Sequence, residues 1–343
     1  MAHFRDMRTP VTLLTGFLGS GKTTLLNAWL RAPSLSDAAV IVNEFGEIGI
    51  DHALIAASSD NTIELSTGCL CCTVKGDLVE TLRDLTQKRA TGEVKPFARV
   101  IIETTGLADP GPVIQALITF PVARTYRLGR IVTAVDAVQG MGTLDRHAEA
   151  RKQAGVADEI VLTKTDLLTG GTEALKQRLA ALAPGARVHE SALGALSQPS
   201  LLDGIDPADP KTRPSEVRAW LRAEQIEEAD PAARHAEDVG SFCLAFDEPL
   251  HWEHVAAWLD ALVIAHGDDL LRVKGILSIQ GRSKPVVVQA VQRLFSPPVE
   301  LAAWPEGLEG SRIVFITRGL SQDYVRQVLD VIRTRPIHFD IAV

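Results

Sequence analysis

Short apolar runs rich in β-branched residues alternate with segments of helical periodicity from Val11 to about Ser197. Such runs predict buried strands, whereas apolar residues that recur every three or four positions predict helices packed on a sheet. Their alternation predicts a doubly wound α/β domain with a mainly parallel sheet. The strands that we expect are residues 11–15, 39–43, 62–65, 99–103, 131–135 and 159–163.

The pattern changes between about Asp203 and Asp238, where proline, alanine and charged residues predominate. We predict a linker at 205–238, with one short helical piece at 217–223. The chain beyond it predicts a smaller α+β domain, with strands at 239–247, 272–280, 286–292 and 312–317 and helices at 254–265 and 321–334. The expected domains are therefore 1–204 and 239–343, joined by this linker.

Composition agrees with two globular domains. The chain has 343 residues, 46% hydrophobic and 23% charged, with a formal net charge of -8. Single cores stop growing near ~250–300 residues, so two domains are expected. The acidic balance offers no basic face for nucleic acid. No apolar run approaches the ~20 residues that span a bilayer, and Met1–Thr9 lacks a signal-peptide core, so we expect a cytoplasmic protein without a membrane partner.

The segment Gly16–Thr23 matches the phosphate-loop pattern G-x-x-x-x-G-K-[ST] in full. A predicted strand precedes it and an amphipathic helix at 24–30 follows it, as this motif requires. The glycines let backbone N–H groups turn toward phosphate oxygens, and the helix N-terminus adds its positive dipole end. Lys22 is expected to reach the β- and γ-phosphates, and the Thr23 hydroxyl to ligate Mg²⁺. The alternative is a glycine-rich turn with a chance lysine.

The predicted strand at 99–103 ends in Glu103, and Gly106 follows in the next loop. In a phosphate-loop domain, an acid at the tip of a neighbouring strand is placed to hold Mg²⁺, usually through water. The backbone N–H of Gly106 can then donate to the γ-phosphate. The alternative is a strand followed by a threonine that caps a helix.

The predicted strand at 159–163 ends in Thr163 and leads to Lys164 and Asp166. A carboxylate at Asp166 can accept two hydrogen bonds from guanine that adenine cannot offer, while the lysine stem lies along the base. This favours GTP over ATP, although the usual GTPase motif begins with Asn where this chain has Thr163. Ser191-Ala192 could place a backbone N–H on guanine O6.

Three cysteines, Cys69, Cys71 and Cys72, fall within four positions. Thiolates bind zinc and other borderline metals, and zinc prefers four ligands, so three thiolates leave an open position suited to passing a metal on. Glu47 and His52 could complete the site transiently and belong to a segment expected to respond to nucleotide. A redox or buried-thiol role is the alternative.

The other candidate metal ligands favour packing roles. Cys243 stands alone in an apolar stretch and is expected in a core. His251 and His254 are three residues apart and could share a helix face, but scattered histidines of this kind are more often surface or packing residues.

These motifs define the expected sites. The catalytic set is Lys22, Thr23, Asp51 and Glu103. The nucleotide-binding set is Gly16, Gly19, Ser20, Gly21, Lys22, Thr23, Thr24, Gly106, Thr163, Lys164, Asp166 and Ser191. The metal-binding set is Cys69, Cys71, Cys72 and Glu47, with Thr23 for Mg²⁺.

The chain resembles the CobW-type phosphate-loop GTPases, related to UreG and HypB, and most of all their YjiA-like branch. The resemblance rests on the segments 16–24, 43–51, 68–72, 103–110, 163–166 and 271–277. It implies a GTPase that binds zinc, or in some members cobalt, at the C-x-C-C thiolates and delivers it to a client metalloprotein in a GTP cycle. It also assigns Lys22 and Thr23 to phosphate and magnesium, Glu103 to the magnesium environment and Asp166 to guanine.

The chain departs from this family in ways that bear on additional metal sites. Val42 stands where some members have a glutamate, the stretch 118–121 lacks a histidine found in some, and there is no histidine-rich loop. The resemblance therefore implies the thiolate site alone.

Two other functions stay open at this point. The protein could be a metal sensor or buffer in which nucleotide mainly stabilises the fold. It could also be an ATP-dependent small-molecule kinase, against which Asp166 argues. The sequence offers no obvious arginine finger, so a client or a second copy of the chain, in a homodimer, could complete the hydrolytic site.

Overall fold

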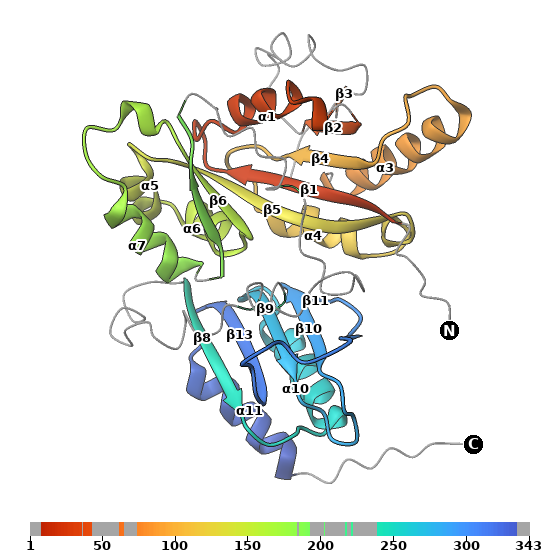
Figure 1. Ribbon diagram of the computed structural model, residues 1–343, viewed down its shortest axis with the longest axis vertical. Helices are drawn as coiled ribbons and strands as arrows, with labels where there is room; N and C mark the ends of the chain where they lie inside the picture. Colours follow the sequence, from red (N-terminus) through yellow and green to blue (C-terminus); the bar gives the residue numbers. More distant parts are fainter. Residues whose placement is uncertain are drawn as a thin grey trace. The chain divides into compact units, whose positions relative to one another are not determined.

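The computed structural model describes residues 8–35, 37–42, 62–64, 74–183, 185–192, 202, 217, 221 and 239–334. The chain divides into two compact units, Met1–Gly204 and Ile205–Val343, each with its own sheet and helices (Figure 1). Within the described part of the chain, no helix has the length and apolar character that crossing a membrane requires.

A parallel sheet forms the centre of the first unit. Its described strands lie in the order β3-β2-β4-β1-β5-β6-β7, and each neighbouring pair is parallel. They are β1 (Thr9–Gly16), β2 (Ala38–Val42), β3 (Thr62–Glu64), β4 (Arg99–Glu103), β5 (Tyr126–Asp136), β6 (Glu159–Thr163) and β7 (Arg187–Glu190). The chain order reverses around β1 and β4, and ligands of such sheets bind beyond the carboxyl ends of strands at this reversal.

Helices flank this sheet. Those in the part of the chain that the structure describes are α1 (Lys22–Leu30), α3 (Val74–Thr91), α4 (Pro110–Ile118), α5 (Gly140–Arg146), α6 (Ala148–Gly155) and α7 (Glu173–Leu182), with single turns of 3-10 helix at η1 (Pro33–Leu35), η2 (Val122–Arg124) and η3 (Thr165–Leu167). Asp109 caps α4 by accepting a hydrogen bond of 2.9 Å from the Gly111 N–H, with Pro110 at the first helical position. Helices α5, α6 and α7 contact one another beside β5 and β6 (Figure 1).

The second unit contains an antiparallel sheet in the order β11-β10-β9-β13-β8, with β12 paired to β10. Its described elements are β8 (Val239–Phe246), α10 (Trp252–His266), β9 (Leu270–Leu277), β10 (Val286–Val291), β11 (Leu294–Phe295), β12 (Val299–Glu300), β13 (Ser311–Arg318) and α11 (Gln322–Thr334). Helices α10 and α11 pack together around a core that contains Trp258 and Phe315. The indole N–H of Trp258 donates to the Val325 carbonyl at 2.9 Å, so the one polar atom of this buried ring is satisfied.

A second apolar cluster of this unit includes residues of the expected linker. Val217 and Leu221 are buried with Ile276, Val287 and Val314. Cys243, which was expected in a core, is only half-buried and packs against the edge of the same cluster. The described residues between 205 and 238 therefore pack as part of the second unit.

The predicted fold class is confirmed, with a parallel α/β unit followed by an α+β unit. Two differences from the predicted strands have the same reason. Strand β5 begins at Tyr126 rather than at residue 131, and β7 was not predicted. Both segments carry charged side chains, and Arg130 and Arg187 bind the buried carboxylate of Glu159, which offsets the cost of placing charge in a sheet.

Candidate functional site

The phosphate loop lies between β1 and α1, as the motif requires. Gly16 has φ +144°, and a Cβ at this position would lie 2.3 Å from the Ala134 carbonyl oxygen, so no other residue fits. The Ser20 N–H donates to the Phe17 carbonyl at 3.1 Å and closes the turn. The loop leads into α1, which starts at Lys22, and the N–H groups and dipole at a helix N-terminus favour an anion.

Lys22 is held inside its own loop. Its ammonium donates to the carbonyl oxygens of Gly16 at 3.0 Å and Phe17 at 3.2 Å, and only 8% of the residue is exposed. The charge is therefore already at the loop before any phosphate arrives. Carbonyl oxygens are neutral acceptors, so a phosphate oxygen would compete well for the same ammonium protons.

Thr23 and Glu103 meet at the carboxyl end of the sheet, as the sequence predicted. The Thr23 hydroxyl donates to Glu103 Oε1 at 2.7 Å, although the two residues are 80 positions apart in the chain. Glu103 is buried, with 4% exposure. A hydroxyl and a carboxylate at this separation form an oxygen donor set of the kind that Mg²⁺ prefers.

Gly106 packs directly on the phosphate loop. A Cβ on Gly106 would lie 2.5 Å from Leu18 Cα and 2.6 Å from Leu18 N, so a side chain would push the two segments apart. The Thr104 hydroxyl adds a second link by donating to Thr15 Oγ1 at 2.9 Å. The segment after Glu103 therefore lies against the loop that is expected to bind phosphate.

The end of β6 is joined to the same loop. The Thr163 hydroxyl donates to the Ser20 carbonyl at 2.6 Å, and the Lys164 ammonium donates to the Gly19 carbonyl at 2.7 Å. Lys164 has φ +58°, a left-handed conformation that is uncommon outside glycine. These contacts bring the predicted phosphate-binding and guanine-binding segments together.

Asp136, which the sequence analysis missed, lies at the end of β5 and binds Lys164. Its Oδ2 accepts from the Lys164 ammonium at 2.6 Å, while its Oδ1 accepts from the Val138 and Gln139 N–H groups at 2.8 and 3.0 Å. Burial by itself raises the pKa of Asp136, but these hydrogen bonds outweigh it and lower the pKa below its ordinary value. The only sign of Asp136 in the sequence is an aspartate directly after a predicted strand. Such aspartates are common because they accept hydrogen bonds from the backbone of the following turn.

Asp166 and Ser191 lie beyond the adjacent strands β6 and β7. Asp166 is exposed within η3. The Ser191 N–H donates to the Leu162 carbonyl at 2.8 Å and so continues the pairing of these strands. A backbone donor to guanine O6 at this position would then be the N–H of Ala192, the second member of the predicted pair.

Several predicted site residues lie outside the described part of the chain. They are Glu47, Asp51, His52, Cys69, Cys71 and Cys72. Within the described ranges, no group of three or more His, Cys, Asp or Glu residues could hold a metal ion. The rings of His251 and His254 do contact each other, with centroids 5.3 Å apart.

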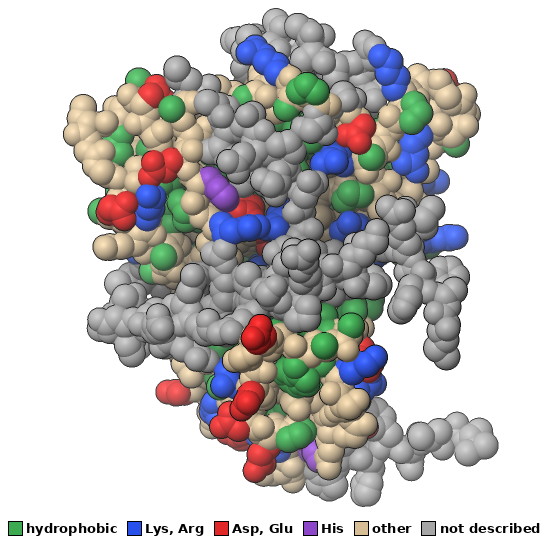
Figure 2. Space-filling view, viewed as in Figure 1, with side chains coloured by type: hydrophobic (Ala, Val, Ile, Leu, Met, Phe, Trp, Pro, Cys, Tyr) green, Lys and Arg blue, Asp and Glu red, His purple; other side chains and the backbone are tan. Residues whose placement is uncertain are grey.

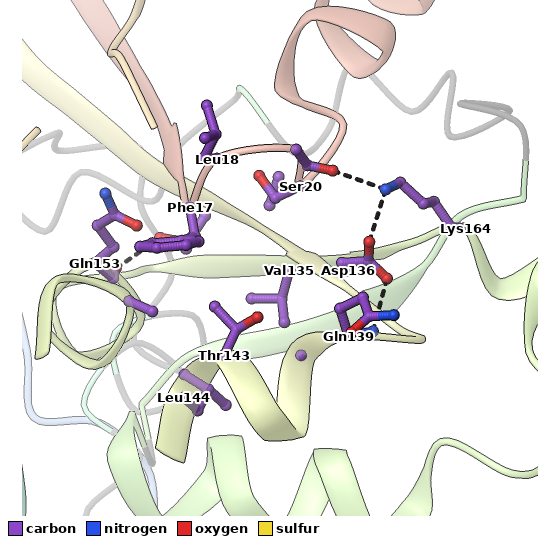
Figure 3. A pocket seen from close by; sticks show the side chains of 15 residues that line it. Phe17, Leu18, Ser20, Val135, Asp136, Gln139, Thr143, Leu144, Gln153 and Lys164 are labelled. Carbon is purple, nitrogen blue, oxygen red and sulfur yellow. Dashed lines mark hydrogen bonds and ion pairs between the residues drawn. The ribbon is translucent and has the colours of Figure 1, made fainter. Parts of the chain in front are cut away.

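A cavity of about 230 Å³ lies beside the phosphate loop (Figure 3). It is lined by loop residues Phe17–Ser20, by the end of β5, by α5 and α6, and by Lys164. Figure 3 shows Lys164 reaching toward both Asp136 and the loop at its rim. Lys22 and Thr23 do not line it, so it adjoins the groups that are expected to bind phosphate and magnesium rather than containing them.

Charged side chains are mixed on the surface. Figure 2 shows acidic and basic side chains of the described residues interspersed on the face in view. The described residues on this face form no broad basic field of the kind that nucleic-acid binding uses. The expected lack of a nucleic-acid partner stays a prediction.

Two family models match the chain, one in each unit. A model described as the CobW/HypB/UreG nucleotide-binding domain matches residues 10–190. A model described as the C-terminal domain of the cobalamin synthesis protein CobW matches residues 239–333.

Individual relatives match almost the whole chain. It is 34% identical over 321 residues to the zinc chaperone YjiA of Escherichia coli, a match that covers 92% of this chain and 96% of that protein. It is 30% identical over 355 residues to the zinc chaperone CobW of Pseudomonas aeruginosa, covering 92% and 89%. The crystal structure of Zn(II)-bound YjiA GTPase from E. coli matches with a TM-score of 0.71 and 30% identity, over 95% of this chain and 99% of that one.

Proposed function

Because the chain belongs to the CobW/HypB/UreG family of nucleotide-binding proteins, we propose that it hydrolyses GTP and couples this reaction to the binding and delivery of zinc. The observation that carries the proposal is the convergence of Lys22 and the Thr23–Glu103 pair at one end of the sheet. Similar proteins named zinc chaperones, one of them with a Zn(II)-bound crystal structure, support zinc as the metal.

The phosphates of GTP would bind to the loop backbone and to Lys22. The ammonium of Lys22 would exchange the Gly16 and Phe17 carbonyls for β- and γ-phosphate oxygens, since a bond between two charged groups is the stronger one. The adjacent N–H groups at the start of α1 donate to the same phosphates. Binding therefore needs an exchange of partners at Lys22 rather than a rebuilt loop.

Thr23 and Glu103 would hold Mg²⁺, Thr23 through its hydroxyl and Glu103 usually through water. The ion supplies positive charge for the bridge between the phosphates when bound. The hydrogen bond from Thr23 to Glu103 fixes both side chains at this position in advance. The N–H of Gly106, on the segment that packs against Leu18, would donate to the γ-phosphate. This hydrogen bond would form with GTP and not with GDP.

Guanine would bind beyond β6. The Asp166 carboxylate would accept hydrogen bonds from N1–H and the exocyclic amine, and the Lys164 stem would lie along the ring. Because Lys164 is also bonded to Gly19 and Asp136, its stem is fixed before the base arrives.

Zinc, or cobalt in its place, is the cargo of this proposed cycle. Cys69, Cys71 and Cys72 would bind it as thiolates, with Glu47 contributing transiently. An open coordination position permits a ligand of the client metalloprotein to enter before the thiolates leave. Asp51 belongs to the same stretch of chain between the phosphate loop and the cysteines. Loss of the γ-phosphate would therefore change metal binding through this stretch.

The proposed chemistry determines the compartment and the partners that the protein needs. Free thiolates require a reducing compartment such as the cytoplasm. A client, or a second copy of the chain in a homodimer, would add the charge that speeds hydrolysis.

Phosphate release from Mg-GTP and Mg-ATP tests the nucleotide part of the proposal. Wild type should turn over GTP in preference to ATP. Thr23→Ala should lower GTP turnover at least about tenfold because it removes an oxygen ligand of Mg²⁺. Asp166→Ala should weaken GTP binding about a hundredfold, the value of two hydrogen bonds to a charged group.

The matched control is Glu149→Gln, which changes an exposed carboxylate on α6 and should leave turnover unchanged. Equal turnover of GTP and ATP, or GTP turnover that survives Thr23→Ala, would contradict the proposal.

A further inference from the structure

Helix α6 contacts both the phosphate loop and the segment that follows Glu103. At its start, the His147 ring stacks on Phe17 of the loop, with centroids 4.4 Å apart. Near its end, Gln153 and Lys152 contact the segment, with Lys152 paired to Asp109 at 2.5 Å. Helix α6 thus contacts both the phosphate loop and the segment after Glu103, which are both expected to bind phosphate. No sequence motif predicted these contacts.

Gln153 makes the central contact. Its side-chain amide nitrogen donates to the carbonyl oxygens of Gly106 at 3.2 Å and Ala108 at 3.0 Å. The residue has no exposed surface. Two carbonyl acceptors at these distances require the nitrogen, not the oxygen, of the amide to face the segment. The amide nitrogen of Gln153 therefore donates both of its protons to the segment that follows Glu103.

The consequence falls on Gly106. Its carbonyl is bonded to Gln153, and its Cα lies so close to Leu18 that a side chain would not fit. A glycine otherwise has wide backbone freedom. Fixing its carbonyl while its Cα rests on the loop restricts φ and ψ, and with them the direction of its N–H.

We infer that Gln153 is a positioning residue that aims the Gly106 N–H at the γ-phosphate, so that the protein discriminates GTP from GDP through α6. This inference rests on the proposed function, because it assumes that Gly106 binds the γ-phosphate. GDP lacks that phosphate. A contact that serves only to position Gly106 therefore affects GTP and leaves GDP binding nearly unchanged, whereas a merely structural contact affects both.

The test compares equilibrium binding of Mg-GDP and a non-hydrolysable Mg-GTP analogue to the full chain. Gln153→Leu removes both donors at similar volume and takes this partner from the buried carbonyl of Gly106 and the half-buried carbonyl of Ala108. We expect the affinity for the analogue to fall about tenfold, the value of one or two lost hydrogen bonds, with GDP affinity within about twofold of wild type.

Gln153→Glu provides a second variant of the same shape. An ionised carboxylate repels the two carbonyls, but a protonated carboxyl regains one donor. The affinity of Gln153→Glu for the Mg-GTP analogue should therefore be further below that of wild type at pH 8 than at pH 6. A variant that simply fails to fold would not show this pH dependence. Glu149→Gln, the reverse exchange on the exposed face of α6, should bind both nucleotides like wild type.

Equal weakening of both nucleotides in both Gln153 variants, or no change in either, would overturn the inference while leaving the proposed function intact. Wild-type protein that binds neither guanine nucleotide would overturn the proposed function and the inference with it.

Discussion

At the scale of single residues, the site depends on side chains that each hold a neighbour in place. Asp136 is an example, since it accepts from the Lys164 ammonium and from two backbone N–H groups. The sequence assigns Lys22, Thr23, Glu103 and Lys164 to the site through motifs and their places at strand ends, and the structure brings these four residues to the same end of the sheet. Sequence reasoning missed Asp136 because nothing in the spacing says that Lys164 crosses to the neighbouring strand.

The lowered pKa of Asp136 predicts a specific pH dependence. A carboxyl whose pKa is lower in the folded state adds stability above its unfolded pKa, and this stability is lost as pH falls through the folded value. Asp136→Asn should therefore lower the free energy of urea unfolding by about 1 kcal/mol at pH 7 and equally at pH 5. The difference should shrink only below the ordinary value of 3.8.

Asp145→Asn is the control, because Asp145 is exposed and its ion pair with Arg178 is loose, at 3.4 Å. A deficit for Asp136→Asn that is absent at pH 7, or that disappears already between pH 7 and pH 5, would show that the carboxylate does not hold Lys164 as described.

At the scale of elements, prediction succeeded where strands are buried on both faces. Strands β4 and β6 match the predicted residues at both ends because central parallel strands are nearly continuous apolar runs. Strand β7 was not predicted, since its Arg187 and His189 give it a polar sequence. These side chains are tolerated because both reach Glu159, and that pairing is a tertiary contact that periodicity does not report.

Glu159 is therefore expected to stabilise this edge of the sheet. Its side chain is fully buried and accepts from Arg130, from Arg187 Nη2 at 2.6 Å and from His189 Nε2 at 2.7 Å. Glu159→Gln removes the negative charge and leaves the guanidinium of Arg130 buried without it. We expect a loss of about 3 kcal/mol in the free energy of unfolding, measured by urea denaturation of the first unit.

Glu173→Gln offers a comparison at an exposed carboxylate paired with Lys176, and removing this exposed ion pair should leave the free energy of unfolding nearly unchanged. If Glu159→Gln costs no more than this control, the buried pairing does not stabilise the sheet edge.

At the scale of the whole molecule, the order of elements predicted both folds, because strand–helix alternation distinguishes a parallel sheet from an antiparallel one. The boundaries 1–204 and 239–343 stay predictions, although Val217 and Leu221 pack with the second unit. The role of α6 was not foreseeable, since Gln153 and Gly106 are 47 positions apart and meet only in the folded chain. The assignments of Cys69, Cys71 and Cys72 rest on sequence and family.

The central claim is that one chain links its nucleotide to its metal, and linkage is reciprocal between two binding sites. The most direct test is an anaerobic competitive titration with Zn(II), Co(II) and Ni(II), with no nucleotide, with Mg-GDP and with a non-hydrolysable Mg-GTP analogue, on wild type and Cys71→Ala. The account predicts that Zn(II) affinity changes about tenfold between the two nucleotides in wild type, and that Cys71→Ala abolishes both tight binding and this change. Zn(II) affinity that is independent of Cys71 and identical in all three nucleotide states would contradict it.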